Sequence, residues 1–258
     1  MRAIRWKVGT FYCLFACLFH LLFSYSALAQ QSTRNDVNIV VAIDCSYSVN
    51  PVEFNLQIAG IAKVFSDPEI VAAIADGPRG SIGIMVSHWS TSKNQKISVP
   101  WTRISNASDA IRLAAQVAGS DRLTVEGGTS ISGVLRHSQA ALEAAPFASD
   151  RRIINLIADG ENNNGERVES ARDWTVRFGT IINAVAIINE RSWLHHYLRN
   201  RVIGGPGAFV ERADDYVDFV RAFKKKLLRE IKGDPIARSP RNSRKYALGE
   251  AETLKSSL

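Results

Sequence analysis

The residues from Val37 to Ile43 are nearly all apolar, and this run ends abruptly at Asp44. A strand that is apolar on both faces belongs in the middle of a parallel sheet, where helices cover both sides. A second apolar run, Ile153–Ile157, leads towards Asp159. These two runs constrain the chain to an α/β fold in which buried strands end close to aspartates.

The rest of the chain alternates between strand and helix patterns and contains no internal repeat. A short connection between the second and third expected strands favours an antiparallel hairpin at the sheet edge. The alternation elsewhere predicts a doubly wound, mainly parallel six-stranded sheet with helices on both faces. The expected strands are Val37–Ile43, Ser81–His88, Lys96–Thr102, Arg152–Ala158, Thr180–Ile188 and Ala208–Glu211.

Helix patterns fill the segments between these strands. The first helix begins at Asn50-Pro51-Val52-Glu53, which combines a capping residue, an early proline and a glutamate at the third helical position. The later helices are expected over 68–75, 106–117, 130–144, 167–178, 193–202 and 213–231. Helical spacing places Ile111, Ala114, Ala115 and Ala118 inward in one helix, and Val217, Phe219, Val220, Phe223 and Leu227 inward in the last.

Asp44, Ser46 and Ser48 alternate on the loop that leaves the first strand. If this turn stays extended, three hard oxygens converge, and such oxygens suit Mg²⁺ or another small hard cation. Ligands of open α/β sheets bind outside the carboxyl ends of the strands. If the two apolar strands are neighbours, Asp44 and Asp159 share one crevice.

Two further pieces of the chain extend this pattern: Gly127-Gly128-Thr129-Ser130 before a helix and Asp159-Gly160 after a strand. Together with Asp44–Ser48 they resemble the von Willebrand factor type A (vWA) domain over about 38–231. Three other stretches are similar to a family of exported bacterial single-vWA proteins of unknown function. These stretches are Glu53–Gln57, Gly160–Gly165 and Gly204–Val210.

The resemblance implies a metal ion-dependent adhesion site, abbreviated MIDAS. Its metal ligands would be Asp44, Ser46, Ser48, Thr129 and Asp159. Asp159 would act through water, which leaves the metal electron-poor. Mg²⁺ is the expected ion, with Mn²⁺ or Ca²⁺ as alternatives, and it keeps exchangeable waters that an incoming ligand can replace. The implied function is capture of an Asp or Glu carboxylate on a protein partner.

The segment 1–29 has the pattern of a signal peptide. Three cations precede an apolar run, and an A-x-A site ends at Ala29. We expect export to the periplasm or the extracellular space, with cleavage near Ala29; lipidation at Cys17 and retention as an anchor remain alternatives. The mature chain would carry no membrane span. Residues 30–232 would form the vWA domain, and the polar segment 233–258 a flexible tail.

Net charge does not indicate a nucleic-acid partner. The leader carries three cations and no acid, so its removal lowers the formal charge from +7 to +4. Aromatic residues do not interleave with the basic cluster Lys224–Lys226. Cys45 would be the only cysteine of the mature chain, and its alternate position favours a buried apolar role over metal ligation.

An enzyme is the main rival class, because an open Mg²⁺ site can activate water. The chain lacks a nucleophile elbow, a dinucleotide loop and a Walker loop, and His195-His196 lack helical ligand spacing. We therefore expect a binding module rather than an enzyme. A metal-dependent hydrolase and a structural subunit of a cell-envelope assembly are the alternatives.

Several residues near the expected site bear on specificity and on metal affinity. His88–Ser92 and Glu161–Asn164 should lie at the same end of the sheet, as contact residues or as ordinary loop residues. Tyr47 and Ala158 stand where the vWA family has smaller or hydroxyl side chains, which would weaken metal binding. The last helix is a candidate lever for affinity.

Overall fold

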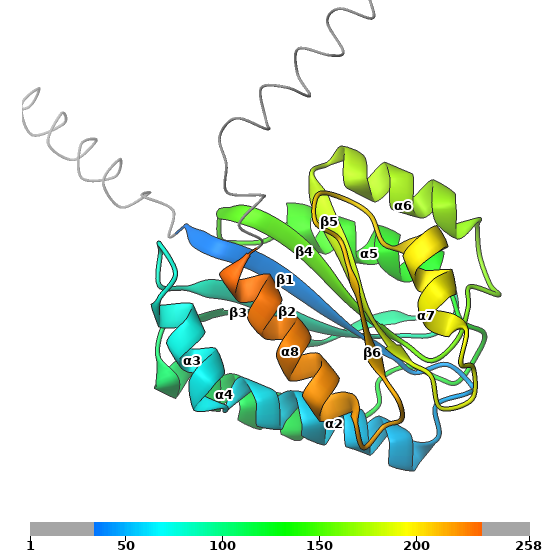
Figure 1. Ribbon diagram of the computed structural model, residues 1–258, viewed down its shortest axis with the longest axis horizontal. Helices are drawn as coiled ribbons and strands as arrows, with labels where there is room; N and C mark the ends of the chain where they lie inside the picture. The colour runs from blue at the N-terminus through cyan, green and yellow to red at the C-terminus, as the bar shows by residue number, and fades with distance from the viewer. Residues whose placement is uncertain (1–33, 234–258) are drawn as a thin grey trace, which may run out of the picture. The chain divides into compact units, whose positions relative to one another are not determined.

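The computed structural model describes residues 34–233 and arranges them around a six-stranded sheet with the strand order β3-β2-β1-β4-β5-β6 (Figure 1). All neighbouring strands are parallel except β2 and β3, which are antiparallel. The predicted fold class and the antiparallel edge strand are thus confirmed. The strands are β1 (Asn35–Asp44), β2 (Ile82–Trp89), β3 (Gln95–Ile104), β4 (Ser149–Ala158), β5 (Thr180–Ile187) and β6 (Val210–Ala213).

Helices cover both faces of the sheet (Figure 1). On one face lie α2 (Pro51–Phe65), α3 (Pro68–Ala75), α4 (Ala107–Ala118) and α8 (Phe219–Lys232). On the other lie α5 (Ile131–Glu143), α6 (Val168–Arg177) and α7 (Leu194–Tyr197), which continues into a π-helical turn, η1 (Leu198–Val202).

Strand β1 lies at the centre of the sheet, and its alternate residues pack into the two hydrophobic cores, one on each face. Ile39 and Val41 pack with the helices of the first face, whereas Val40 and Ala42 pack with those of the second. Every residue of β1 is buried. The apolar run read from the sequence is therefore covered on both sides, as a central parallel strand requires.

Local capping fixes the loop between β1 and α2. The Asn50 side chain accepts hydrogen bonds from the main-chain nitrogens of Val52 and Glu53, at 2.9 and 3.1 Å. The Glu53 carboxylate in return accepts from the Asn50 main-chain nitrogen at 2.8 Å. This capping box confirms the helix start and holds the chain just after Ser48.

Two helix predictions were wrong: the buried face of α4 and the first residue of α8 differ from those expected. In α4 the buried positions are Ala110, Leu113, Ala114 and Val117, so Ile111, Ala115 and Ala118 face solvent. The spacing i, i+3, i+4, i+7 is right, but it begins one residue earlier than predicted. Helix α8 begins at Phe219 rather than Ala213, because Ala213 ends β6 and residues 214–218 form a turn, which leaves Val217 77% exposed.

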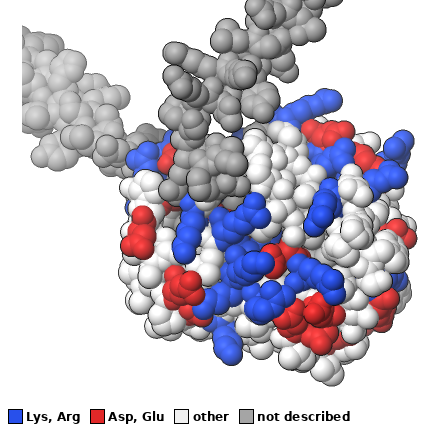
Figure 2. Space-filling view, in the orientation of Figure 1, with Lys and Arg blue, Asp and Glu red and all other residues white. Residues whose placement is uncertain are grey.

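Charged residues are abundant on the face covered by α8 and α3, and basic and acidic side chains are interspersed there (Figure 2). Lys224 forms ion pairs with Asp67 and Glu69 at 2.7 and 3.0 Å, and Lys225 with Glu211 at 2.8 Å. The basic residues of the last helix thus have acidic neighbours on the same surface.

The predicted leader, 1–29, and the predicted tail, apart from Gly233, lie outside the described residues. Among residues 34–233, no helix combines the length and the apolar character that crossing a membrane requires.

Candidate metal centre

The predicted site residues lie where β1 and β4 end. These two strands are neighbours and run parallel, with Ala42 opposite Leu156. Asp44, the last residue of β1, and Asp159, which follows β4, therefore emerge side by side. Their exposed fractions are only 1% and 7%. The fold thus buries two carboxylates next to each other at the carboxyl edge of the sheet.

A chain of hydrogen bonds joins four of the five predicted residues. Asp44 Oδ1 accepts from the Ser46 main-chain nitrogen at 2.8 Å. The hydroxyl oxygens of Ser46 and Ser48 are 3.2 Å apart, and Ser48 Oγ donates to Asp159 Oδ1 at 2.7 Å. The alternating acid and hydroxyls of this loop therefore converge, as the sequence spacing indicated.

Thr129 reaches the same place from the connection between α4 and α5. Its main-chain nitrogen donates to Asn163 Oδ1 at 2.8 Å, and its Oγ1 lies 3.5 Å from the point that a Cβ on Gly160 would occupy. Thr129 and Ser48 line one hollow of about 190 Å³, which we call the metal hollow. Its lining is Tyr47, Ser48, Gly127, Gly128, Thr129, Gly160, Glu161, Asn163 and Arg191.

Burial places the two carboxylates in an unfavourable electrostatic state. Loss of water, and next the nearby Asp159 carboxylate, raise the pKa of Asp44 to about 8. Burial likewise raises the pKa of Asp159. Asp44 Oδ2 is buried and has no hydrogen-bond partner within residues 34–233. A buried acid oxygen without a donor is costly, and a cation would relieve the cost.

The donor set favours a hard divalent cation. It consists of two carboxylates and three hydroxyls, all oxygen. Within the described part of the chain, no group of three or more His, Cys, Asp or Glu side chains is placed to hold a metal ion. Any ion bound here would therefore depend on hydroxyl or water oxygens as well, and Mg²⁺ accepts such ligands readily. The residues present fit the ion that the sequence implied.

Arg122 holds the loop 45–49 in place, a role that no sequence pattern indicates. Its guanidinium donates to the main-chain oxygens of Cys45 and Val49 at 2.7 and 2.9 Å, and to that of Ser46 at 3.2 Å. These contacts fix the main-chain oxygens of a sharp turn, in which the Ser46 oxygen also accepts from the Val49 main-chain nitrogen at 3.0 Å. Arg122 is distant in sequence and lies in an irregular connection, so only the folded chain shows the contact.

Asn162, Asn163 and Asn164 tie three loops together. Their side-chain oxygens accept from the main-chain nitrogens of Ser132, Thr129 and Ser92, at 2.9, 2.8 and 2.9 Å respectively. The asparagine run thus has a structural use in shaping the metal hollow, whichever partner surface it also offers. Gly128 is required beside it, because a Cβ there would lie 2.9 Å from Asn163 Oδ1.

Tyr216 links the metal centre to the last helix. It lies between β6 and α8, and its hydroxyl donates to Asp159 Oδ2 at 3.0 Å. Burial, followed by the neighbouring carboxylates, raises the pKa of Tyr216 above its usual value, so the hydroxyl stays protonated and remains a donor. Both oxygens of Asp159 are therefore held by hydroxyl groups.

His88 and Trp89, which the sequence offered as possible partner-contact residues, are buried instead. Trp89 is fully buried in the core on the α5 side, and the His88 ring meets Phe54 edge-on with centroids 5.2 Å apart. Burial lowers the pKa of His88 to about 4.

Two other expectations concern the loop after β1. Cys45 is buried as expected, and burial raises the pKa of its thiol to about 12. Tyr47 is 73% exposed, so it does not crowd the loop.

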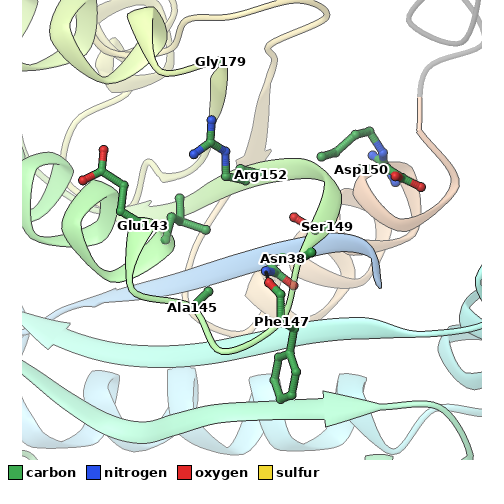
Figure 3. Close-up of a pocket in the computed structure, with 11 residues that line it drawn as sticks. Asn38, Glu143, Ala145, Phe147, Ser149, Asp150, Arg152 and Gly179 are labelled. Atoms are coloured by element: carbon green, nitrogen blue, oxygen red, sulfur yellow. Dashed lines mark hydrogen bonds between the residues drawn. The ribbon is translucent and has the colours of Figure 1, made fainter. Parts of the chain in front are cut away.

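A larger hollow lies at the opposite edge of the sheet, where β1 and β4 begin. Its volume is about 610 Å³. Glu143 from α5 and Arg152 from β4 stand on its walls (Figure 3). Asn38 inside it donates to the Phe147 main-chain oxygen at 2.7 Å and accepts from the Asn35 amide at 3.0 Å. Its asparagine is thus already satisfied, in contrast to Asp44.

Comparison with solved structures shows that the fold is that of vWA domains. Proximal thread matrix protein 1 from the mussel byssus is 15% identical with a TM-score of 0.56, covering 77% of this chain and 48% of its own. A second structure of that protein has a zinc-occupied MIDAS motif. A von Willebrand factor type A protein from Catenulispora acidiphila is 15% identical with a TM-score of 0.51, covering 77% and 43%.

The pilus tip protein Mfa5 from Porphyromonas gingivalis has a vWF domain that is 9% identical with a TM-score of 0.52, covering 75% of this chain and 94% of its own. The chain spans about half the length of the mussel protein it matches. No curated protein matches it. The family described as "Protein of unknown function (DUF1194)" matches residues 34–235. The chain therefore belongs to the DUF1194 family and has the fold of a vWA domain.

Proposed function

We propose that the protein holds a divalent cation through Asp44, Ser46, Ser48, Thr129 and Asp159, and uses it to capture a carboxylate of a protein partner. The observation that carries this proposal is the buried oxygen of Asp44, which has no hydrogen-bond partner within residues 34–233 and lies near a second buried carboxylate, Asp159. Ser48, which donates to Asp159, lines the metal hollow. Mg²⁺ is the ion we propose, with Mn²⁺ or Ca²⁺ as alternatives.

Charge supports the proposal. Two carboxylates formally neutralise one divalent cation, and the hydroxyls add neutral oxygens. Mg²⁺ prefers six oxygen ligands and keeps several waters, so a metal bound here would offer an exchangeable position towards the hollow. An Asp or Glu side chain of another protein is a hard oxygen donor that can replace such a water. The bound ion would supply Lewis acidity, and the chain's residues would hold and orient it.

The surface around the metal hollow suits a protein partner. Exposed apolar side chains lie on the connections that form its walls: Tyr47 between β1 and α2, Leu123 and Val125 between α4 and α5, and Trp193 between β5 and α7. Tyr47 and Val125 are 73% and 69% exposed. Of these, Tyr47 lines the metal hollow itself, and aromatic residues are enriched at protein interfaces. The solved proteins that share the fold include a pilus tip protein and a byssal thread matrix protein, which agrees with a binding role outside the cell.

Calorimetric titration of the full chain with Mg²⁺, Mn²⁺ and Ca²⁺ tests the metal step. We expect binding by the wild type, and loss of binding in Asp44→Asn and Asp159→Asn. Asp150→Asn, at the opposite edge of the sheet, is the matched control and should bind normally. Failure of all three ions to bind at millimolar concentration would contradict the proposal.

A pull-down with Mg²⁺ or with EDTA, using the wild type and Asp159→Ala, tests the capture of a partner. A partner retained equally in all four samples would refute the metal bridge.

A further inference from the structure

Arg191 lines the metal hollow together with Ser48 and Thr129. It belongs to the β5–α7 connection, and its Nη1 donates to the Asp159 main-chain oxygen at 3.3 Å. A Cβ built on Gly160 would lie 3.5 Å from Arg191 Nη1 and 3.5 Å from Thr129 Oγ1. The guanidinium and a proposed metal-ligand hydroxyl therefore border one shared space beside Gly160.

This guanidinium has donors to spare. An arginine carries five N–H groups in a planar fork, and a single long main-chain bond uses little of that capacity. No carboxylate of residues 34–233 forms an ion pair with Arg191, although a majority of the arginines in the same part of the chain have one. A cation beside a metal site is unfavourable unless an anion lies between the two.

We propose that Arg191 is the second anchor for the captured acid: the ligand carboxylate bridges the bound metal and the Arg191 guanidinium. This inference rests on the proposed function and specifies its ligand. Two cationic contacts on one small group select an anion with two oxygens and reject a neutral amide of the same shape. Gly160 keeps the space open, because a side chain there would enter the gap between Arg191 and Thr129.

Glu161 modulates the same contact. Its exposed carboxylate lines both the metal hollow and a neighbouring hollow bordered by Arg167 and Arg201. A negative charge on the rim repels an incoming acid, so Glu161 should lower affinity where Arg191 raises it. The pair gives two neighbouring substitutions with opposite expected signs.

Acetate is the probe for this proposal, and acetamide is its neutral isostere. The full chain is loaded with Mn²⁺, and displacement of metal-bound water is followed by water proton relaxation during the titration. We expect Arg191→Gln to raise the acetate dissociation constant about tenfold, and Arg191→Lys to raise it less, because lysine keeps the charge without the fork. Glu161→Gln should lower it. Arg199→Gln, an exposed arginine in η1, controls for net charge and should leave it unchanged.

Metal affinity is measured separately by calorimetry and should be equal or tighter in Arg191→Gln, since a nearby cation has been removed. Unchanged acetate affinity in Arg191→Gln, with Mn²⁺ still required, would overturn the role of Arg191 and leave the proposed function intact. Acetate affinity that calorimetry finds equal with and without Mn²⁺, and lost in Arg191→Gln, would instead overturn the metal bridge. Acetamide binding as tight as acetate would overturn both.

Discussion

Two buried carboxylate centres lie on this sheet, and they are compensated in opposite ways. Glu230 of α8 is 2% exposed, and both of its oxygens have donors. Asn155 donates to Oε2 at 2.7 Å and Asn183 to Oε1 at 3.0 Å, while the fully buried Lys226 supplies the countercharge. Asp44, in contrast, has a second acid for a neighbour, and its Oδ2 has no donor among residues 34–233.

The difference separates a structural centre from a binding centre. Asn155 and Asn183 are paired across β4 and β5, so their amides face α8 together and fix its position. In that centre, the Glu230 carboxylate has its donors and its countercharge within the protein. At the other centre, no cation of residues 34–233 forms an ion pair with Asp44 or Asp159, and Ser48, which donates to Asp159, lines the metal hollow. Under our proposal this second centre takes its countercharge from solution. The predictions below test whether the two centres behave in these two ways.

The largest effect is expected from Lys226→Met. The substitution leaves the Glu230 carboxylate buried without its cation, which typically costs about 3–5 kcal/mol of the free energy of unfolding. Metal affinity should not change. Urea denaturation and calorimetry measure the two quantities. Lys225→Met, an exposed neighbour on the same helix, should alter stability by less than about 1 kcal/mol. Equal losses in the two variants would show that the Glu230 centre does not depend on its internal cation.

Asp44→Asn should have the opposite sign. The amide can still accept from the Ser46 nitrogen, and it removes a desolvated charge next to Asp159. We expect the metal-free protein to gain on the order of 2 kcal/mol at pH 8, and to lose the stabilisation by Mg²⁺ that the wild type shows. Thermal denaturation with EDTA and with Mg²⁺ provides the test. Destabilisation without metal would mean that the Asp44 charge is already compensated within the fold.

A pH dependence follows from the same centre. The folded-state pKa of Asp44, about 8, lies above its ordinary value of 3.8, so the folded chain binds more protons than the unfolded chain between these limits. Stability contributed by the protonated acid is present below pH ~4 and is lost as pH rises through about 8. In EDTA we expect a loss of about 2 kcal/mol between pH 6 and 7.5, absent in Asp44→Asn. Stability that rises with pH over this interval, equally in both proteins, would contradict the prediction.

The fold and the placement of the two aspartates could be predicted because they depend on local patterns. An apolar strand followed by an acid needs no distant information, and parallel neighbours bring their carboxyl ends to one edge. The contacts of Arg122, Tyr216 and Lys226 depend instead on where remote segments pack. The inward face of α4 was also misplaced, because its alanines are small enough to fit either a buried or an exposed position, and periodicity alone could not set the phase.

The smallest expected effect comes from Tyr216→Phe, and it tests whether the two centres communicate through α8. Removing the hydroxyl deprives Asp159 Oδ2 of its donor at 3.0 Å, a loss of about 1 kcal/mol that corresponds to roughly fivefold weaker Mg²⁺ binding. Tyr47→Phe is the control, because that residue is 73% exposed. If Lys226→Met weakens Mg²⁺ binding as much as Tyr216→Phe does, the two centres are coupled through the last helix. If only Tyr216→Phe does so, the Tyr216 hydroxyl in the turn before α8 holds the metal centre by itself, and the Glu230 centre stabilises the fold alone.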